Sequence, residues 1–489
     1  MNHHRLGFGT MVTYGFGQIS EAVKNAGFSV FLLFYYNQVM QVSATGISIM
    51  LAIALIFDAV SDPVAGGLSD KVTTRWGRRH PFILVSAIPL AIAFYLLFNP
   101  PAGMSELGYL LWLLVFSVLV RAAMTFYSIP HLALGAEMAR DYNQRSTMYA
   151  FNTFFGFLGG AMFVPASYRL FFPTTEEFNP ALLNQAAYSP WSLFAGAIMI
   201  FAIVVCVLGT AREIPRLRAE NALVVRSRFG MRRLLSELVA AFANKSFRAI
   251  FFGMMLGTFI LAVEGVFNPF MGFHFWGMTT EQLSFLPLGS VIGLVLSMFV
   301  TPWATSRFDK KPTLIGSALL TIFNINVPIV LALFDVSWFP ARGSDILLFI
   351  LILNALITAL LGPVIFATLN SMFADITDEH ELEVDERREG VIFAARAFAV
   401  KATSSLGLVF GGVLLDLIAF PRGASMGSVP ADTVWQLGFI AGPATSVFTF
   451  FGMLLYMGYR IDRTRHSEIL TELQIRRDRA AGSDSGSQN

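Results

Sequence analysis

The sequence predicts an all-α membrane protein in which twelve transmembrane helices form two six-helix halves. Three observations support this fold class. Hydrophobic residues make up 55% of the 489 residues and charged residues only 13%, whereas soluble domains carry about 25% charged residues. Twelve apolar segments approach or exceed the roughly 20 residues that span a bilayer. A basic segment between the sixth and the seventh of them divides the chain in two.

The twelve segments are bounded by polar loops. In the first half the predicted spans are 11–39, 46–68, 81–98, 109–137, 148–171 and 191–211. In the second half they are 248–275, 283–306, 313–334, 345–372, 390–418 and 435–457. The predicted domains are an N-terminal half over 1–211, a linker over 212–247, a C-terminal half over 248–457 and a tail over 458–489.

The distribution of Lys and Arg predicts the orientation of the helices. Basic residues gather in the loops after the second, fourth, eighth and tenth spans, in the linker and in the tail. The remaining loops contain few, chiefly Arg342 and Arg422. Because cytoplasmic loops carry the excess of Lys and Arg, both termini are expected in the cytoplasm.

The two halves also share a short charged turn at matching positions. SDKVTTRWGRRHP follows the second span, and SRFDKKP follows the eighth. Such an echo is typical of the parallel repeats from which many transporters are built.

One stretch, Phe57–Pro81, combines intramembrane acids with a basic turn. Asp58 and Asp62 are four residues apart, so a helix places both carboxylates on one face, one turn apart. Acids inside a membrane are costly and by default indicate function. Two neighbouring carboxylates repel each other unless a cation lies between them or one is protonated. This pattern predicts a cation site.

Several motifs together resemble a known family. DAVSDP in the second span, the RWGRRHP turn, YGFG at Tyr14–Gly17, GAEMARDYNQRS at Gly135–Ser146 and ADITDEHELEVDERREG at Ala374–Gly390 occur in this order. In these motifs the chain is similar to the glycoside–pentoside–hexuronide:cation symporters, the melibiose-carrier-like family of the major facilitator superfamily. The resemblance implies the major facilitator fold and symport of a solute with sodium or a proton.

The resemblance also implies roles for individual residues. Asp58 and Asp62 match the family's coordinating acids, Ser61 stands at a further oxygen-donor position, and Thr125 matches a cation-site threonine. They would hold sodium, if the coupling ion is not a proton. Lys401 on the eleventh span matches a lysine near that site and is assigned to coupling.

The solute pocket departs from the family pattern. Three positions that bind sugar through charged groups in the family's sugar carriers are Ala22, Ser128 and Thr153 here. Other polar groups would have to replace them, because buried polar groups of a sugar need partners. The residues expected to bind solute are Glu21, Lys24, Tyr127, Ser128, His131, Asn152, Thr153 and Glu264.

Structural roles compete with these assignments. Asp58 and Asp62 could form a buried ion-pair cluster with Lys401 or Arg121. Glu21 and Lys24 could pair with each other at i,i+3 spacing. Likewise, Glu264 could bond to Asn268, and His131 could be a core residue. In the loops, Asp70 and Asp375 could pair with arginines and hold the inward gate shut.

The predicted function is cation-coupled symport of a small organic solute, most simply a sugar or glycoside. The alternative solute is a lysophospholipid or other amphiphile, and a channel or a non-transporting membrane sensor is less favoured. No enzyme motif, cofactor or nucleic-acid partner is expected. The single Cys206 excludes an intramolecular disulfide. We expect a monomer in the plasma membrane, the inner membrane of a bacterium, in contact with lipid.

Overall fold

Helices are the only regular elements in the part of the chain that the computed structural model describes. The described residues are 6–72, 74–139, 142–221, 242, 244–384 and 389–486. A helix satisfies its backbone polar groups within one segment, which a bilayer requires of any spanning structure.

The N-terminal half begins with a helix in consecutive pieces. These pieces are α1 (Phe8–Phe16), α2 (Gln18–Ala26) and the π-helical segments η1 (Gly27–Leu32) and η2 (Tyr35–Val39). The remaining long helices are α3 (Ala44–Lys71), α4 (His80–Leu97), α5 (Glu106–Met138), α6 (Tyr142–Phe171) and α7 (Tyr188–Thr210). The short 3₁₀ turns η3 (Ala181–Leu183), η4 (Gln185–Ala187) and η5 (Ala211–Glu213) and the helix α8 (Ile214–Asn221) flank α7.

The C-terminal half repeats this layout. Its helices are α10 (Lys245–Phe270), η6 (Met271–Phe275), α11 (Thr280–Leu283), α12 (Leu286–Phe308), α13 (Lys310–Leu333), α14 (Asp345–Val384) and α15 (Glu389–Leu417). The last span consists of α16 (Ala431–Phe439), η7 (Ile440–Ala444) and α17 (Thr445–Tyr456), and the tail forms α18 (Arg463–Gly486).

Ten helices in the described ranges are long and apolar enough to cross a membrane. The other two predicted spans are the first, which the structure divides into pieces, and the second, whose apolar stretch within α3 is Ala44–Asp58. These two segments carry Glu21, Lys24 and the acid pair. The chain is therefore an integral multi-pass membrane protein, and the count of twelve spans stays a prediction.

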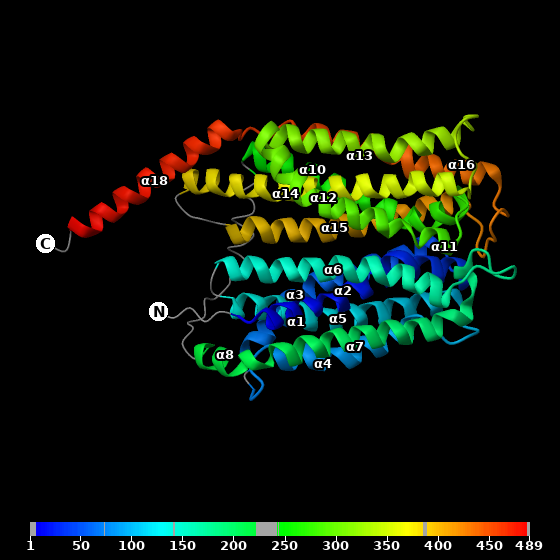
Figure 1. Cartoon of the computed structure of the whole chain (residues 1–489), viewed down its shortest axis with the longest axis horizontal. Helices are drawn as coiled ribbons and strands as arrows, with labels where there is room; N and C mark the ends of the chain where they lie inside the picture. The colour runs from blue at the N-terminus through cyan, green and yellow to red at the C-terminus, as the bar shows by residue number, and fades with distance from the viewer. Residues whose placement is uncertain are drawn as a thin grey trace.

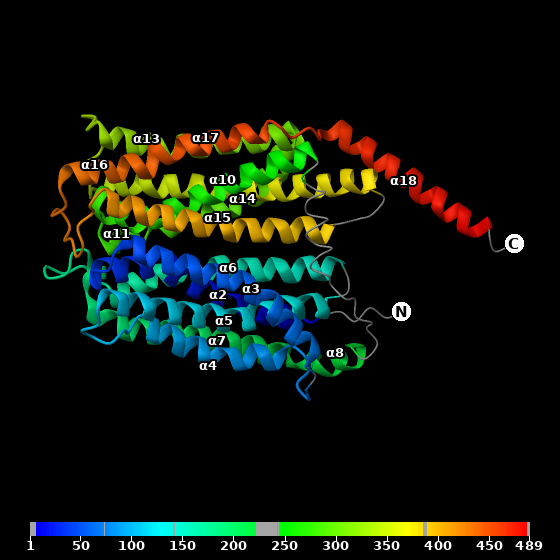
Figure 2. The same ribbon diagram turned by 180° about the vertical axis from the view of Figure 1, so that it is seen from behind.

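The two halves pack side by side, with α3 of one against α15 of the other. The start of α1, α8 and α18 lie at one end of the bundle, here called the terminal end, and α11 and α16 lie at the opposite end (Figures 1 and 2). Gly412 on α15 permits the close crossing, because a Cβ there would meet the carbonyl oxygen of Ala44 at 2.6 Å. This crossing positions residues of both halves around one site.

Hydrogen bonds fasten the two halves together at the end opposite the termini. The Asp416 carboxylate on α15 accepts from the backbone N–H groups of Ala44 (3.2 Å) and Thr45 (2.8 Å), the first turn of α3. Glu281 on α11 accepts from the N–H and hydroxyl of Thr174, both at 2.7 Å. A carboxylate at a helix N-terminus satisfies unpaired backbone donors and complements the helix dipole.

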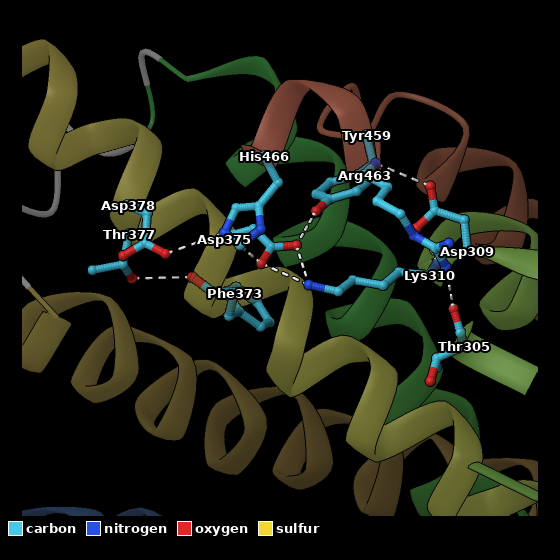
Figure 3. A network of polar contacts seen from close by, with 10 residues as sticks. All are labelled: Thr305, Asp309, Lys310, Phe373, Asp375, Thr377, Asp378, Tyr459, Arg463 and His466. Carbon is cyan, nitrogen blue, oxygen red and sulfur yellow. Dashed lines mark hydrogen bonds and ion pairs between the residues drawn. The ribbon is translucent and has the colours of Figure 1, made fainter. Parts of the chain in front are cut away.

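At the terminal end, a buried carboxylate organises the C-terminal half (Figure 3). Asp375, whose side chain is 4% exposed, accepts from Lys310 Nζ (2.7 and 2.6 Å) and from Tyr459 OH (2.7 Å), and pairs with His466 at 3.3 Å. Burial and the Asp375 carboxylate raise the pKa of Tyr459 well above its usual range, so the hydroxyl stays a donor. The network joins α13, α14 and α18 within one half.

The N-terminal half has a matching contact after its own second span. Arg78 (2.6 Å) and Arg79 (2.8 Å) both donate to Oε1 of Glu137 on α5. The two echoed turns thus each bind a carboxylate in their own half. Asp375, expected to pair with a loop arginine, pairs with Lys310 instead, and the Asp70 side chain lies outside the described part of the chain.

Candidate cation and solute site

Two carboxylates and a threonine form the centre of the candidate site. Asp58 and Asp62 lie one turn apart on α3, as their spacing predicts. The Thr125 hydroxyl on α5 lies 3.0 Å from Asp58 Oδ1 and 3.1 Å from Asp62 Oδ1. Since a hydroxyl has one proton, it donates to one carboxylate at a time. The contact draws the two acids together, although like charges repel.

Lys401 reaches the same acids from the opposite half. Its ammonium lies 3.3 Å from Asp58 Oδ2 and 2.5 Å from Asp62 Oδ2, and Arg121 lies 3.6 Å from Asp58 Oδ2. The side chains of Asp58, Asp62 and Lys401 are 18%, 30% and 27% exposed. The ammonium thus bridges both carboxylates at the point where a coupling cation would offset their repulsion.

Ser61 lies beside this cluster, but its hydroxyl is bonded along its own helix. It donates to the backbone carbonyl of Asp58 at 3.1 Å. A serine that bonds back to its own helix competes with the backbone bond there. A role as a cation ligand requires this hydroxyl to turn toward the carboxylates, so the assignment stays a prediction.

Glu21 and Lys24 lie on α2 but form no ion pair with each other among the described contacts. Glu21 accepts from Gln18 Nε2 at 2.8 Å. Lys24 is only 9% exposed, and its ammonium lies 5.9 Å from the ring centre of Phe28. Glu21, Asp58, Arg121 and Lys401 are all within electrostatic reach of it. The first span therefore contributes a buried cation to the site.

Tyr127 and His131 are buried in the core of the N-terminal half. His131 Nε2 is 3.0 Å from the carbonyl oxygen of Tyr14, and its ring stacks on Tyr14 at 4.3 Å and on Tyr127 at 5.1 Å. Tyr127 is fully buried, and a Cβ at Gly17 would meet its hydroxyl at 2.5 Å. These contacts agree with the core role weighed for His131 and place neither ring against the acid pair.

The other predicted solute residues are distributed over three helices. Ser128 on α5 and Asn152 on α6 are half-buried, and the Asn152 Oδ1 atom is enclosed without a hydrogen-bond partner. Thr153 is exposed, and Glu264 on α10 is half-buried. No hydrogen bond within the described ranges joins Glu264 to Asn268. The structure does not bring these four side chains together with the acid pair through direct contacts.

Phe28 is the residue that the sequence did not single out. Two cations approach its ring: the Arg121 guanidinium lies 5.1 Å and the Lys24 ammonium 5.9 Å from its centre. The chain has 48 Phe residues, and the position of this one, four residues after Lys24, was the only available signal.

An all-helical membrane bundle whose halves meet at paired intramembrane acids and a lysine is the architecture of a membrane transporter. Residues 13–463 match the family described as MFS/sugar transport protein. The chain therefore belongs to this family of the major facilitator superfamily, and the resemblance to the glycoside–pentoside–hexuronide symporters is confirmed. Its members are transporters, so the protein is a transporter and not an enzyme.

Individual relatives agree with this assignment. The chain is 24% identical to the uncharacterized symporter sll1374 of Synechocystis, over 97% of this chain and 98% of that protein. It is 23% identical to the sodium-dependent lysophosphatidylcholine symporter 1 of Gallus gallus, over 99% and 93%. The fold resembles the crystal structure of the nucleoside transporter NupG, with a TM-score of 0.60 and 13% identity over 92% of this chain and 99% of that one. Symporters among the relatives imply a coupling ion and a small-molecule solute.

Proposed function

We propose that the protein is a secondary active symporter that couples the movement of sodium or a proton to the uptake of a small organic solute. The observation that carries this proposal is the bridging of Asp58 and Asp62 by Lys401 across the two halves. Twelve spans with both termini in the cytoplasm complete it, in agreement with the distribution of basic loops.

Lys401 gives a physical basis for coupling. Its ammonium neutralises the acid pair and at the same time joins α3 to α15. A coupling cation that takes its place releases this link between the halves. A proton on one acid has the same effect, since it removes a charge that holds the lysine. Ion binding thereby changes the relative free energies of two arrangements of the halves, which is how a ligand shifts a conformational equilibrium.

The described contacts join the two halves at the end of the bundle opposite the termini. Asp416 and Glu281 join the halves at the end opposite the termini. At the terminal end, the networks of Asp375 and of Glu137 each stay within their own half. With the termini in the cytoplasm, the contacts of Asp416 and Glu281 hold the halves together on the outer side, and alternating access requires these contacts to break when that side opens.

A sugar or glycoside is the solute that the family description favours. Because Ala22, Ser128 and Thr153 carry no charge, other groups must make its hydroxyl contacts, and Glu21, Lys24 and Asn152, whose Oδ1 atom has no hydrogen-bond partner, are the candidates. The alternative is a lysophospholipid or other amphiphile. It is favoured by the lysophosphatidylcholine symporter among the relatives and by Phe154, which is 56% exposed on α6.

A thermal-shift experiment on the purified protein tests the function and separates the solutes. A ligand that binds only the folded state raises the apparent melting temperature. We expect a methyl glycoside to stabilise the protein more when sodium is present, or at lower pH if the proton is the coupling ion. If lysophosphatidylcholine alone does so, the amphiphile is the solute. If neither probe shows ion-dependent stabilisation, and proteoliposomes show no ion-driven uptake of either, the symport proposal is wrong.

A further inference from the structure

Lys24 is a buried cation whose ammonium has no polar partner among the described residues. Its side chain is nine-tenths buried, and its one described direct contact is with the Phe28 ring at 5.9 Å. Burying a charge without a paired, hydrogen-bonded partner is strongly unfavourable. A lysine kept in this environment is therefore expected to have a partner at some stage of the transport cycle.

Arg121 leaves a second unsatisfied donor on the same ring. Its guanidinium lies 5.1 Å from the centre of Phe28, and its buried Nε has no hydrogen-bond partner. Its ion pair with Asp58 measures 3.6 Å, which is too long for a hydrogen bond. Two cations from different helices, α2 and α5, thus approach the same half-buried ring, and each has donors without a hydrogen-bond partner among the described residues.

The neighbouring acids are already engaged. Glu21 accepts from Gln18, while Asp58 and Asp62 share Thr125 and Lys401. These three acids balance three cations, Lys24, Arg121 and Lys401. A coupling sodium ion or proton then leaves the cluster with one excess positive charge, in surroundings that screen charge far less than water does.

We infer that the transported solute carries an anionic group, a carboxylate or a phosphate, which Lys24 and Arg121 bind beside Phe28. This inference rests on the proposed symport function and narrows its solute class. The anion restores neutrality after the coupling ion enters, so each ligand strengthens the binding of the other. An anionic glycoside and a lysophospholipid head group both offer this chemistry, and Phe28 provides an apolar surface for the rest of either.

Matched pairs of probes separate the charge from the remainder of the molecule. One pair is methyl β-D-glucuronide and methyl β-D-glucoside, which differ in the carboxylate. The other is a lysophosphatidate and the monoacylglycerol with the same acyl chain, which differ in the phosphate. Binding to the purified full-length protein is measured by thermal shift and by ligand titration. We expect the anionic member of one pair to bind about tenfold more tightly than its neutral partner, and the pair that responds identifies the source.

Variants at the two cations connect this preference to the site. Lys24→Gln and Arg121→Gln should each remove the preference for the anion, and Lys24→Arg should retain it because the charge remains. Asn25→Ala, an exposed neighbour on the same helix, is the control and should behave as the unaltered protein. Ion-induced stabilisation is recorded for every variant and reports whether the acid pair still binds its ion.

The outcomes separate this inference from the function on which it rests. Equal binding of both members of each pair, binding by a neutral member alone, or no binding of any anionic probe overturns the inference. Undiminished anion preference in both Lys24→Gln and Arg121→Gln also overturns it. If ion-driven uptake of a neutral probe is observed, the symport function stands and only the anionic class fails. If neither sodium nor protons stabilise the unaltered protein, the symport function itself is contradicted.

Discussion

Replacing Asp62 with asparagine isolates the electrostatic part of the candidate cation site. The amide has nearly the same shape and can still accept from Thr125, which lies 3.1 Å from Asp62 Oδ1. It removes the negative charge that holds the Lys401 ammonium at 2.5 Å. Asp58 then faces Lys401 and Arg121 as the only remaining acid of the pair, so an incoming cation gains little by displacing the lysine.

The size of the effect follows from Coulomb's law. A unit charge 4 Å from a carboxylate is worth about 4 kcal/mol at an effective dielectric constant near 20. Because the Asp62 side chain is 30% exposed, solvent screening reduces this, and we take about 2 kcal/mol. That corresponds to roughly thirtyfold weaker binding of the coupling cation.

The assay is a titration of the purified variant with sodium at fixed pH and constant ionic strength, using thermal shift as the signal. A second titration with protons replaces sodium by choline. The Asp432→Asn variant is the matched control, because it makes the same chemical change at an exposed site on α16, and it should change affinity less than threefold. An Asp62→Asn protein that binds the ion within threefold of normal, or still accumulates solute against a gradient, refutes the reasoning.

Three further predictions concern Lys401 and the two ends of the bundle. Lys401→Met should tighten ion binding about tenfold, because it removes a competitor for Asp58 and Asp62. The same variant should abolish ion-driven accumulation of solute. Weaker ion binding in titrations would contradict competition between Lys401 and the ion. Asp416→Ala should cost about 1–2 kcal/mol of the contact that caps α3 and widen the α3–α15 distance opposite the termini in spin-label measurements. Asp432→Ala, at an exposed site on α16, should leave the α3–α15 distance unchanged. Equal distances in the two variants would contradict the role of Asp416 in joining α15 to α3. Asp375→Asn should destabilise the folded protein by about 2–3 kcal/mol, because Lys310 and Tyr459 lose a carboxylate that is 4% exposed. Asp378→Asn, whose partner His466 is 3.3 Å away, should lower the stability by under about 1 kcal/mol. Similar melting temperatures for the two variants would contradict the larger contribution that burial gives to Asp375.

Helix content and the acid pair were predictable from the sequence because both depend on local spacing. Asp58 and Asp62 fall on one face of any helix through them, and the apolar runs predict where α5, α7 or α15 cross a bilayer. The match with family motifs also predicted Thr125 and Lys401 as members of the same cluster. The structure brings all four together.

The individual solute assignments were less predictable, because they depend on how each helix is rotated about its axis. Tyr127 lies two residues from Thr125 on α5, yet it packs into the core with His131 and Tyr14. The i,i+3 spacing of Glu21 and Lys24 allows an ion pair, yet Glu21 bonds to Gln18 instead. Spacing identifies the residues that can meet, whereas packing against neighbouring helices selects among them.

The sequence by itself determined that the chain crosses a membrane many times and that two carboxylates lie one turn apart inside it, since hydropathy and helical periodicity are local properties. Only the tertiary structure decided that Lys401, 339 positions from Asp62, bridges both acids, and that Lys24 and Arg121 share the Phe28 ring with donors unsatisfied. These contacts join helices distant in the chain, and their geometry is set by close packing between α3 and α15, where Gly412 leaves room for Ala44. No property of a single segment contains that information.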